Sequence, residues 1–293
     1  MKEIEFIKPR RKFLVFSIIC IIVVIFVLII NKGLNLGLDF TGGTLIHIKS
    51  FDETNIENLR KIFTEFGYVK GIELQNIISA EPKTKEFLIK IKSTEEEQSK
   101  KILDILKEKN ILYEVVRIEY VGPTIGKHLT KKALYAIVFS LLGIIIYVGI
   151  RFGSSIWGVA GVVALAHDVF LTIGFLTLLG KEITITVIAA ILTLAGYSIN
   201  DTIVIFDRIR ENIKLMRKET LERIINISIN QNLSRTILTS GTTLAAGLSL
   251  YILGNQIIKD FALSLVFGVI VGTYSSIFVA SALVLEYNLL KKK

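Results

Sequence analysis

The run "FLVFSIICIIVVIFVLII" at residues 13–30 decides the class of fold to which this chain belongs. It holds eighteen residues without a charge, which is enough for a helix that crosses a hydrocarbon core about 30 Å thick. Further apolar runs of similar length follow at 133–150, 156–178, 183–206, 236–253 and 261–285. Because 52% of all residues are hydrophobic, the sequence predicts an α-helical multi-pass membrane protein with six spans.

The first run could instead be the core of a secretory signal peptide, because the basic stretch "KPRRK" (8–12) precedes it. Two features favour an uncleaved span. The run is longer than a usual signal core, and no small-residue cleavage site follows in "IINKGLNLG" (29–37). The single cysteine, Cys20, lies in this run, so the chain can form no disulfide with itself.

Basic residues predict the orientation of the six spans. The leader 1–12, the segment 207–235 and the tail 286–293 are rich in Lys and Arg, and six spans place all three on one side. By the positive-inside rule this side is the cytoplasm, so we expect both termini there. The net charge of +9 is therefore a topology signal, and no basic stripe with interleaved aromatic residues indicates nucleic-acid binding.

The polar stretch 31–131 between the first two spans is expected to be one extracytoplasmic domain, followed by a five-helix membrane domain over 132–285. Strand-like and helical patterns alternate in the order βαββαβ, at 43–50, 54–67, 71–79, 86–93, 94–110 and 111–120. This is the ferredoxin-like α+β arrangement, which hosts many functions and identifies none. For His47 on the first strand we expect a packing or surface role rather than metal binding.

The stretch "GLDFTGGT" (37–44) looks like a glycine-rich phosphate loop, but it lacks the Lys–Ser/Thr ending that such a loop needs. We predict a tight turn into the domain instead. In it Gly42 and Gly43 adopt unusual backbone angles, and Asp39 bonds nearby amides. Since no nucleotide loop is found, the sequence does not indicate an ATP-driven pump.

A carboxylate inside the fourth span marks a candidate functional site. The stretch "GYSINDTIVIF" (196–206) places Asp201 among apolar residues, beside the polar Asn200. A charge at the centre of a span costs about 2.5–3.5 kcal/mol on insertion scales, and such residues usually serve function. Asp201 is therefore a candidate for proton binding. The alternative is a structural hydrogen bond near the end of its helix.

Arg235 opens the fifth span and lies at the head of a polar stripe. Helical spacing from this arginine gives a row of small and hydroxyl side chains, namely Thr239, Thr242, Ala246 and Ser249. A carboxylate on one helix that faces Arg and hydroxyls on the next would form a proton relay. In the alternative interpretation, Arg235 extends to the cytoplasmic lipid headgroups.

The third span holds His167 and Asp168 near its centre. Adjacent helical residues point about 100° apart, so the two side chains are not expected to line one narrow face. Asp168 is a second candidate for relay or gating, with a structural hydrogen bond as the alternative. In the sixth span, small residues recur every fourth position, at Gly268, Gly272, Ser276 and Ala280. This small-residue ridge predicts close helix packing.

Several of these motifs, in this order, resemble the SecF members of the SecD/SecF family, which belongs to the resistance-nodulation-division superfamily. They are "GLDFTGGT", "VGPTIGKHL", "AHDVFLTIGF", "GYSINDTIVIFDRIREN", "SRTILTSGTTL" and "FALSLVFGVIVGTYSSIFVASALVL". The resemblance covers nearly the whole chain. The intramembrane acid, arginine and hydroxyl of the family fall on Asp201, Arg235 and Thr239.

The resemblance implies a proton-driven subunit, not an enzyme, in the bacterial cytoplasmic membrane. With SecD it would complete preprotein export after the ATP-driven SecA stage, next to the SecYEG channel, with protons as coupling ion and no other cofactor. The implied partners are SecD, SecYEG, SecA, unfolded preprotein and the lipid bilayer. A complete superfamily unit has twelve spans, so we expect a separate SecD, bound through the fourth span and the small-residue ridge.

Two other classes of function remain open at this point. Half of a proton-coupled transporter for small solutes would share the membrane architecture, but would be expected to have twelve spans and larger outer domains. A structural scaffold of the translocon would need no acid inside the membrane. Substitution of Asp201 by Asn would then have no effect.

Overall fold

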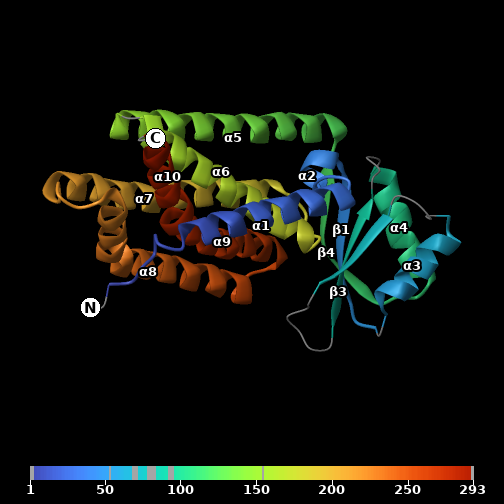
Figure 1. Cartoon of the computed structure of the whole chain (residues 1–293). Helices are drawn as coiled ribbons and strands as arrows, with labels where there is room; N and C mark the ends of the chain where they lie inside the picture. Colours follow the sequence, from blue (N-terminus) through green and yellow to red (C-terminus); the bar gives the residue numbers. More distant parts are fainter. Residues whose placement is uncertain are drawn as a thin grey trace. The chain divides into compact units, whose positions relative to one another are not determined.

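The computed structural model describes residues 3–52, 54–67, 72–77, 84–91, 96–153 and 155–291. The chain divides into two compact units (Figure 1). One is a helix bundle formed by Met1–Asn35 and Tyr135–Lys293, and the other is an α+β unit formed by Leu36–Leu134.

Six helices in the described part of the chain are long and apolar enough to cross a membrane, by length and composition. Five are single helices: α1 (Arg10–Ile30), α5 (Pro123–Phe152), α6 (Ser155–Leu178), α7 (Ile185–Leu215) and α8 (Leu221–Leu253). The sixth consists of α9 (Gln256–Ser275), a π-helical turn η1 (Ser276–Ala280) and α10 (Ser281–Lys291). The six predicted spans are therefore confirmed.

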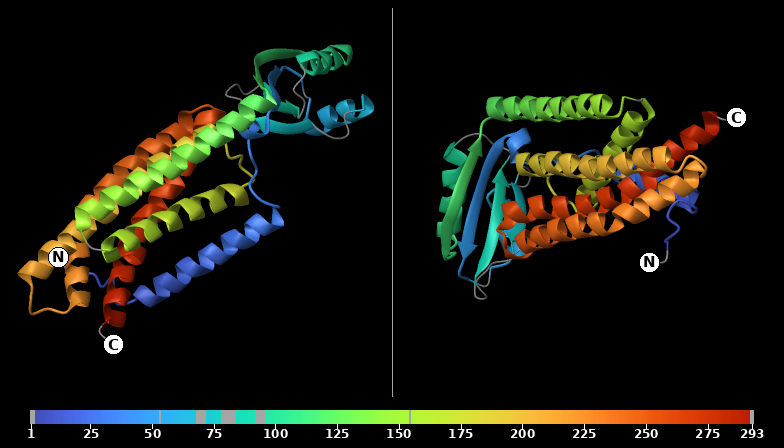
Figure 2. Two further views of the ribbon diagram at one scale, coloured as in Figure 1. Left: turned by 90° about the horizontal axis from the view of Figure 1, so that it is seen from above. Right: turned by 90° about the vertical axis from the view of Figure 1, so that its left-hand side faces the viewer.

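Helices α5, α7 and α8 run well past the apolar stretches that predicted them, and α5 begins at Pro123 rather than at 133. Helix α7 continues from the predicted end at 206 to Leu215, and α8 begins at Leu221 rather than at 236. The charged continuations stay helical because they pack on each other, as the 2.8 Å hydrogen bond from Asn212 Nδ2 to Ser228 Oγ shows. Figure 2 shows α7 and α8 as an antiparallel pair joined by a short turn.

The sixth helix contains an irregularity that the sequence did not predict. At η1 the backbone makes one π-helical turn, and the hydroxyl of Ser281 donates to the carbonyl oxygen of Ser276 at 3.0 Å. Single π turns inside α-helices often lie at functional sites. The sequence does not predict this π turn, because no Pro or Gly occurs within 276–280.

The small-residue ridge packs α9 closely against α7. A Cβ atom at Gly268 would lie 2.3 Å from Leu194 Cδ2, and one at Gly272 would lie 3.1 Å from Ser198 Cβ. The predicted close packing of this ridge is confirmed. Since the ridge is buried inside the chain, the prediction that it also binds a partner subunit is wrong.

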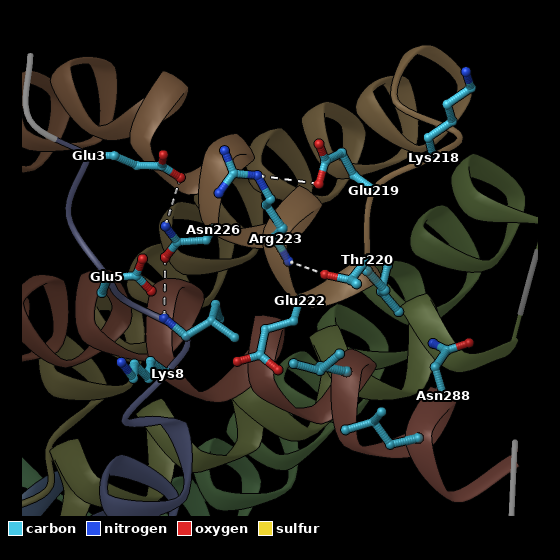
Figure 3. Close-up of a pocket in the computed structure, with 14 residues that line it drawn as sticks. Glu3, Glu5, Lys8, Lys218, Glu219, Thr220, Glu222, Arg223, Asn226 and Asn288 are labelled. Atoms are coloured by element: carbon cyan, nitrogen blue, oxygen red, sulfur yellow. Dashed lines mark hydrogen bonds and ion pairs between the residues drawn. The ribbon is translucent and has the colours of Figure 1, made fainter.

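The extended N-terminal segment is held by asparagine side chains of α8. Asn226 Oδ1 accepts from the backbone N–H of Phe6 at 2.8 Å, and its Nδ2 donates to Ile4 O at 3.1 Å. Asn230 bonds both the N–H and the carbonyl of Ile4, at 3.0 and 2.8 Å. Figure 3 shows Asn226 beside Glu3, on the wall of a cavity of about 670 Å³.

Substitution of Asn226 by Ala is expected to release this N-terminal segment. The change removes the acceptor of the part-buried N–H of Phe6 and of the buried N–H of Ile7, which costs about 1–3 kcal/mol. Hydrogen exchange of a peptide covering residues 3–9 should accelerate in the detergent-solubilised protein. Asn288→Ala is the matched control, because Asn288 lines the same cavity and its amide donates to Val284 O of its own helix. Equal exchange in both variants would contradict the assignment.

The α+β unit has the predicted order βαββαβ, preceded by the short helix α2 (Leu38–Thr41). Its elements are β1 (Gly43–Ser50), α3 (Ile56–Glu65), β2 (Ile72–Ile77), β3 (Lys85–Ile91), α4 (Glu96–Glu108) and β4 (Tyr113–Val121). The sheet order is β2-β3-β1-β4, with all neighbouring pairs antiparallel. The ferredoxin-like prediction is confirmed, while residues 80–83 of the predicted turn lie outside the described residues.

Helices α3 and α4 cover one face of this sheet (Figure 1). Fully buried side chains join the layers, namely Ile46, Ile48, Phe87 and Ile89 from the strands and Leu59, Ile102 and Leu106 from the helices. Helix α3 is capped by Asn55, which accepts from Asn58 N at 2.8 Å, and not by the preceding Thr54. His47 Nε2 lies 2.9 Å from Glu86 Oε2 on the neighbouring strand.

Candidate functional site

Asp201 lies on the buried face of α7, where three membrane helices meet. Its side chain is 8% exposed. Oδ1 accepts a hydrogen bond from Thr236 Oγ1 of α8 at 2.9 Å. Oδ2 accepts one from Ser276 Oγ of η1 at 2.5 Å. The carboxylate therefore links α7 to both neighbouring helices through hydroxyl groups.

The spacing of buried residues on α7 explains this position. Val187, Ile191, Leu194 and Ser198 are buried at intervals of three or four residues, and Asp201 continues the same stripe. The apolar members of the stripe fix the orientation of the helix. They thereby direct the carboxylate into the bundle instead of toward lipid.

A layer of hydroxyl groups lies one helical turn away from Asp201. Tyr197 Oη donates to Ser240 Oγ at 3.1 Å, and Ser240 Oγ lies 2.7 Å from Thr273 Oγ1. Ser276 Oγ also reaches the carbonyl oxygen of Thr273 at 3.1 Å. Hydrogen bonds thus connect polar groups of α7, α8, α9 and η1 over two neighbouring layers of the bundle.

Asp168, the second predicted carboxylate, is completely buried on α6. Its Oδ1 lies 2.9 Å from Nδ1 of His167, and its Oδ2 accepts from Ser198 Oγ at 2.5 Å and Ser275 Oγ at 2.8 Å. The side chains of His167 and Asp168 turn toward each other, although their Cβ atoms diverge along the helix. Asp168 therefore links α6 to α7 and α9.

The predicted stripe that starts at Arg235 faces outward from the chain. Arg235, Thr239 and Thr242 are exposed, and in the described part of the structure Arg235 forms no ion pair. The hydroxyl of Thr239 donates to backbone carbonyls of its own helix, at 3.0 and 3.1 Å. Asn200, next to Asp201, is also exposed. The structure thus brings Asp201 to Thr236 and not to Arg235.

The sequence patterns do not predict which hydroxyl groups donate hydrogen bonds to the two carboxylates. They are Thr236, Ser276, Ser198 and Ser275. A signal for one of them exists, because helical spacing from Thr236 gives a second stripe through Ser240 and Gly247, offset by one residue from the predicted stripe. Both Ser240 and Gly247 are buried.

The glycine pair that was predicted to form a tight turn joins α2 to β1. Gly42 has φ 71° and Gly43 has φ 135°, in the region that L side chains rarely adopt. A Cβ atom at Gly43 would lie 2.4 Å from the carbonyl oxygen of Ile91. Asp39 lies in the first turn of α2. Gly43 lets this turn lie directly against β3, whereas a Cβ atom at Gly42 would lie 3.2 Å from the carbonyl oxygen of Val121.

Two family models match the chain. The model described as "Protein export membrane protein SecD/SecF, C-terminal" matches residues 101–290, which is more than half of the chain. The model described as "SecD/SecF GG Motif" matches residues 27–49, including the glycine pair. The chain belongs to the SecD/SecF family.

SecD/SecF relatives of similar length are named protein translocase subunit SecF. The one from Endomicrobium trichonymphae is 39% identical over 99% of this chain and 93% of its own length. The one from Calditerrivibrio nitroreducens is 44% identical over 99% of this chain and 96% of its own. The chain is accordingly a SecF subunit of protein translocase, a multi-pass membrane transport protein and not an enzyme.

The SecD/SecF fold is also found in a solved structure, that of SecDF from Thermus thermophilus, described as a translocon-associated membrane protein. It superposes with a TM-score of 0.89 at 39% identity, over 98% of this chain and 39% of the SecDF chain. The chain therefore spans about two fifths of the length of the SecDF chain.

Proposed function

We propose that the chain uses the proton motive force, together with SecD, to complete preprotein translocation after the SecA stage. The observation that carries this proposal is Asp201, a carboxylate buried in a membrane bundle and held by hydroxyls from two other helices. Ionisable groups inside spans mark ion and proton pathways. The SecYEG channel and the unfolded preprotein are the proposed partners outside this pair of subunits.

Protonation of Asp201 changes the hydrogen bonds that join the helices. The ionised carboxylate accepts from Thr236 and from Ser276, whereas a protonated carboxyl group must donate through one of its oxygens. Ser276 has a second acceptor within reach, the carbonyl oxygen of Thr273 at 3.1 Å. Proton binding would therefore replace the charge-assisted hydrogen bond between α7 and η1 by a weaker neutral one, and proton release would restore it.

A change in helix packing would be transmitted to the α+β unit through its covalent connections to the bundle. The unit lies between α1 and α5 in sequence, so a shift in the packing of the bundle can reach it along both connections. We place this unit outside the membrane, where its movement would bias an emerging preprotein in the outward direction.

The exposed faces of α7 and α8 fit the interface with SecD. On α7 the exposed stripe is small and polar, at Ala189, Thr193, Gly196 and Asn200. Such residues favour contact with protein rather than lipid. On α8, Arg235 and Thr239 are exposed directly beside Thr236. At a SecD interface the arginine would lie next to the layer of Asp201, where its charge would balance the ionised form.

Residues 36–134 are expected outside, and both termini are expected in the cytoplasm. A single cysteine at position 85, in a Cys20→Ser background, should react with a membrane-impermeant maleimide added to spheroplasts. A cysteine at position 218, in the turn between α7 and α8, should react only after permeabilisation. Reaction at position 85 restricted to permeabilised cells would reverse the orientation.

Reconstitution tests the proposed function. The chain should co-purify with SecD from mild detergent. In vesicles that also contain SecYEG and SecA, late preprotein translocation should then accelerate when a proton gradient is imposed. A complex that assembles but translocates equally with and without the gradient would refute proton coupling.

A further inference from the structure

His167 and Asp168 form a buried polar pair that the proposed function does not use. His167 is 6% exposed and Asp168 is fully buried. Nε2 of His167 has no hydrogen-bond partner among the described residues. Leaving a polar atom buried and unpaired costs free energy, so packing alone does not explain a histidine here. The pair has the chemistry of a proton acceptor enclosed in the bundle.

Neighbouring groups hold the two buried carboxylates of the bundle. Ser275 donates to Asp168, and the next residue, Ser276, donates to Asp201. On α7, Ser198 donates to Asp168 and lies three residues before Asp201, on the same face of the helix. Any displacement of α9 or η1 against α7 must therefore alter the hydrogen bonds of both carboxylates.

We propose that the His167–Asp168 pair is a second proton-binding site, coupled to Asp201 through Ser275 and Ser276. This inference rests on the proposed function, in which Asp201 is the first site. In the ionised pair, Nδ1–H of His167 donates to Oδ1 of Asp168, and Oδ2 accepts two hydroxyl hydrogens. One proton added from water at Oδ2 neutralises the pair. It turns an acceptor into a donor, so Ser198 or Ser275 must redirect its hydroxyl hydrogen.

Close packing transmits such a change along the sixth helix. A Cβ atom at Gly272 would lie 3.1 Å from Ser198 and 3.6 Å from Oδ2 of Asp168, so α9 already touches both elements. The π turn begins at Ser276, directly after Ser275. A π turn is a local departure from the α-helical ladder, where hydrogen-bond partners change within one turn. At this turn the hydrogen bonds of the adjacent Ser275 and Ser276 can change together when either carboxylate is protonated.

The other titratable groups around this pair already have partners or belong to the first site. Tyr274 of α9 has its ring 6.3 Å from that of His167, and its hydroxyl donates to Phe13 O at 2.8 Å. Glu286 of α10 is paired with Arg10 at 2.8 Å. The thiol of Cys20 on α1 and the carboxylate of Asp201 on α7, the first site, also lie on helices packed against α6. Within the described residues, His167 is the one side chain with a basic nitrogen within 4.0 Å of the carboxylate of Asp168.

Infrared difference spectroscopy during a pH titration of the SecD complex in nanodiscs tests this proposal, because a protonated carboxyl group has its own C=O band. The Asp201→Asn complex should retain one titrating carboxyl band from the bundle, and the Asp201→Asn/Asp168→Asn complex should lose it. Ser275→Ala should move the midpoint of that band by roughly half to one pH unit. Ser264→Ala should leave it unchanged, because Ser264 is buried on the same helix and donates to Asp260 O of its own backbone.

A second measurement tests the coupling between the Asp168 and Asp201 sites. In the Asp168→Asn complex, the midpoint of the Asp201 band should also move, and an unchanged midpoint would show that the two sites are independent. If the Asp168→Asn variants fail to assemble, the band is assigned instead by its response to Ser198→Ala and Ser275→Ala, which keep the acid. A spectrum of Asp201→Asn without any titrating band from the bundle would overturn the second site. These bands do not depend on translocation, so failure of the proposed function is recognised separately, by its gradient response.

Discussion

Asp201→Asn is expected to abolish the stimulation of preprotein translocation by a proton gradient, while the complex with SecD still assembles. Asn has the shape of Asp, and it can accept from one hydroxyl and donate to the other, so the contacts with Thr236 and Ser276 persist in altered form. What is lost is the ability to bind and release a proton. Vesicles with equal amounts of wild-type and variant complex, assayed with and without a gradient, measure the effect.

The matched control for this substitution is Asp207→Asn. It makes the same chemical change on the same helix, where Asp207 pairs with Arg151 at 2.6 Å in an exposed position. Exposed ion pairs contribute little, so this variant should keep its gradient response. A full gradient response of Asp201→Asn would mean that this carboxylate is structural.

Substitution of two threonines of α8 distinguishes the hydrogen bond seen in the structure from the polar stripe predicted by the sequence. Thr236 contacts Asp201, whereas Thr239 is exposed and bonds its own backbone. The same vesicle assay should therefore show a much weaker gradient response for Thr236→Val than for Thr239→Val. The opposite order would mean that the outward stripe of Arg235 and Thr239 governs the proton site through SecD. Arg235→Lys, which keeps the charge without the planar guanidinium, would then retain partial activity.

The sequence predicts those features of the fold that depend on periodicity. Long apolar runs locate six spans, and alternation in 43–50 with helical spacing in 54–67 begins a βαββαβ domain that the structure confirms. Charges in apolar runs single out Asp168 and Asp201, and both lie in the buried polar core of the bundle. Such positions can be recognised in the sequence because charged residues are rare within membrane spans.

The contacts between helices cannot be predicted from the sequence in the same way. A shift of one residue turns a helical stripe by about 100°, so the sequence alone does not tell which of two adjacent polar rows on α8 faces Asp201 within the chain. Spacing counted from Arg235 leads to Thr239, whereas the hydrogen bond in the structure comes from Thr236. The ends of α7 and α8 were missed because charged residues there pack on protein outside the apolar runs. The π turn at Ser276 leaves no signature in composition.

Gly43→Ala is expected to destabilise the α+β unit by about 3 kcal/mol or more. Gly43 has φ 135°, and a Cβ atom there would lie 2.4 Å from the carbonyl oxygen of Ile91. Both groups belong to the backbone of a paired sheet, β1 against β3, so neither can move without breaking hydrogen bonds. The amides of β1 and β3 should exchange roughly a hundredfold faster or more in the purified full-length chain.

Gly67→Ala provides the comparison that separates the clash from backbone strain. Gly67 also has a positive φ, 85°, but a Cβ atom there would meet nothing within 4 Å. Its substitution should cost about 1 kcal/mol, through strain at the end of α3 alone. A much larger effect at Gly43 than at Gly67 would show that Gly43 is required for the close approach of the turn after α2 to β3. Equal effects at both positions would mean that φ alone requires the glycine, and that the close approach to Ile91 is dispensable.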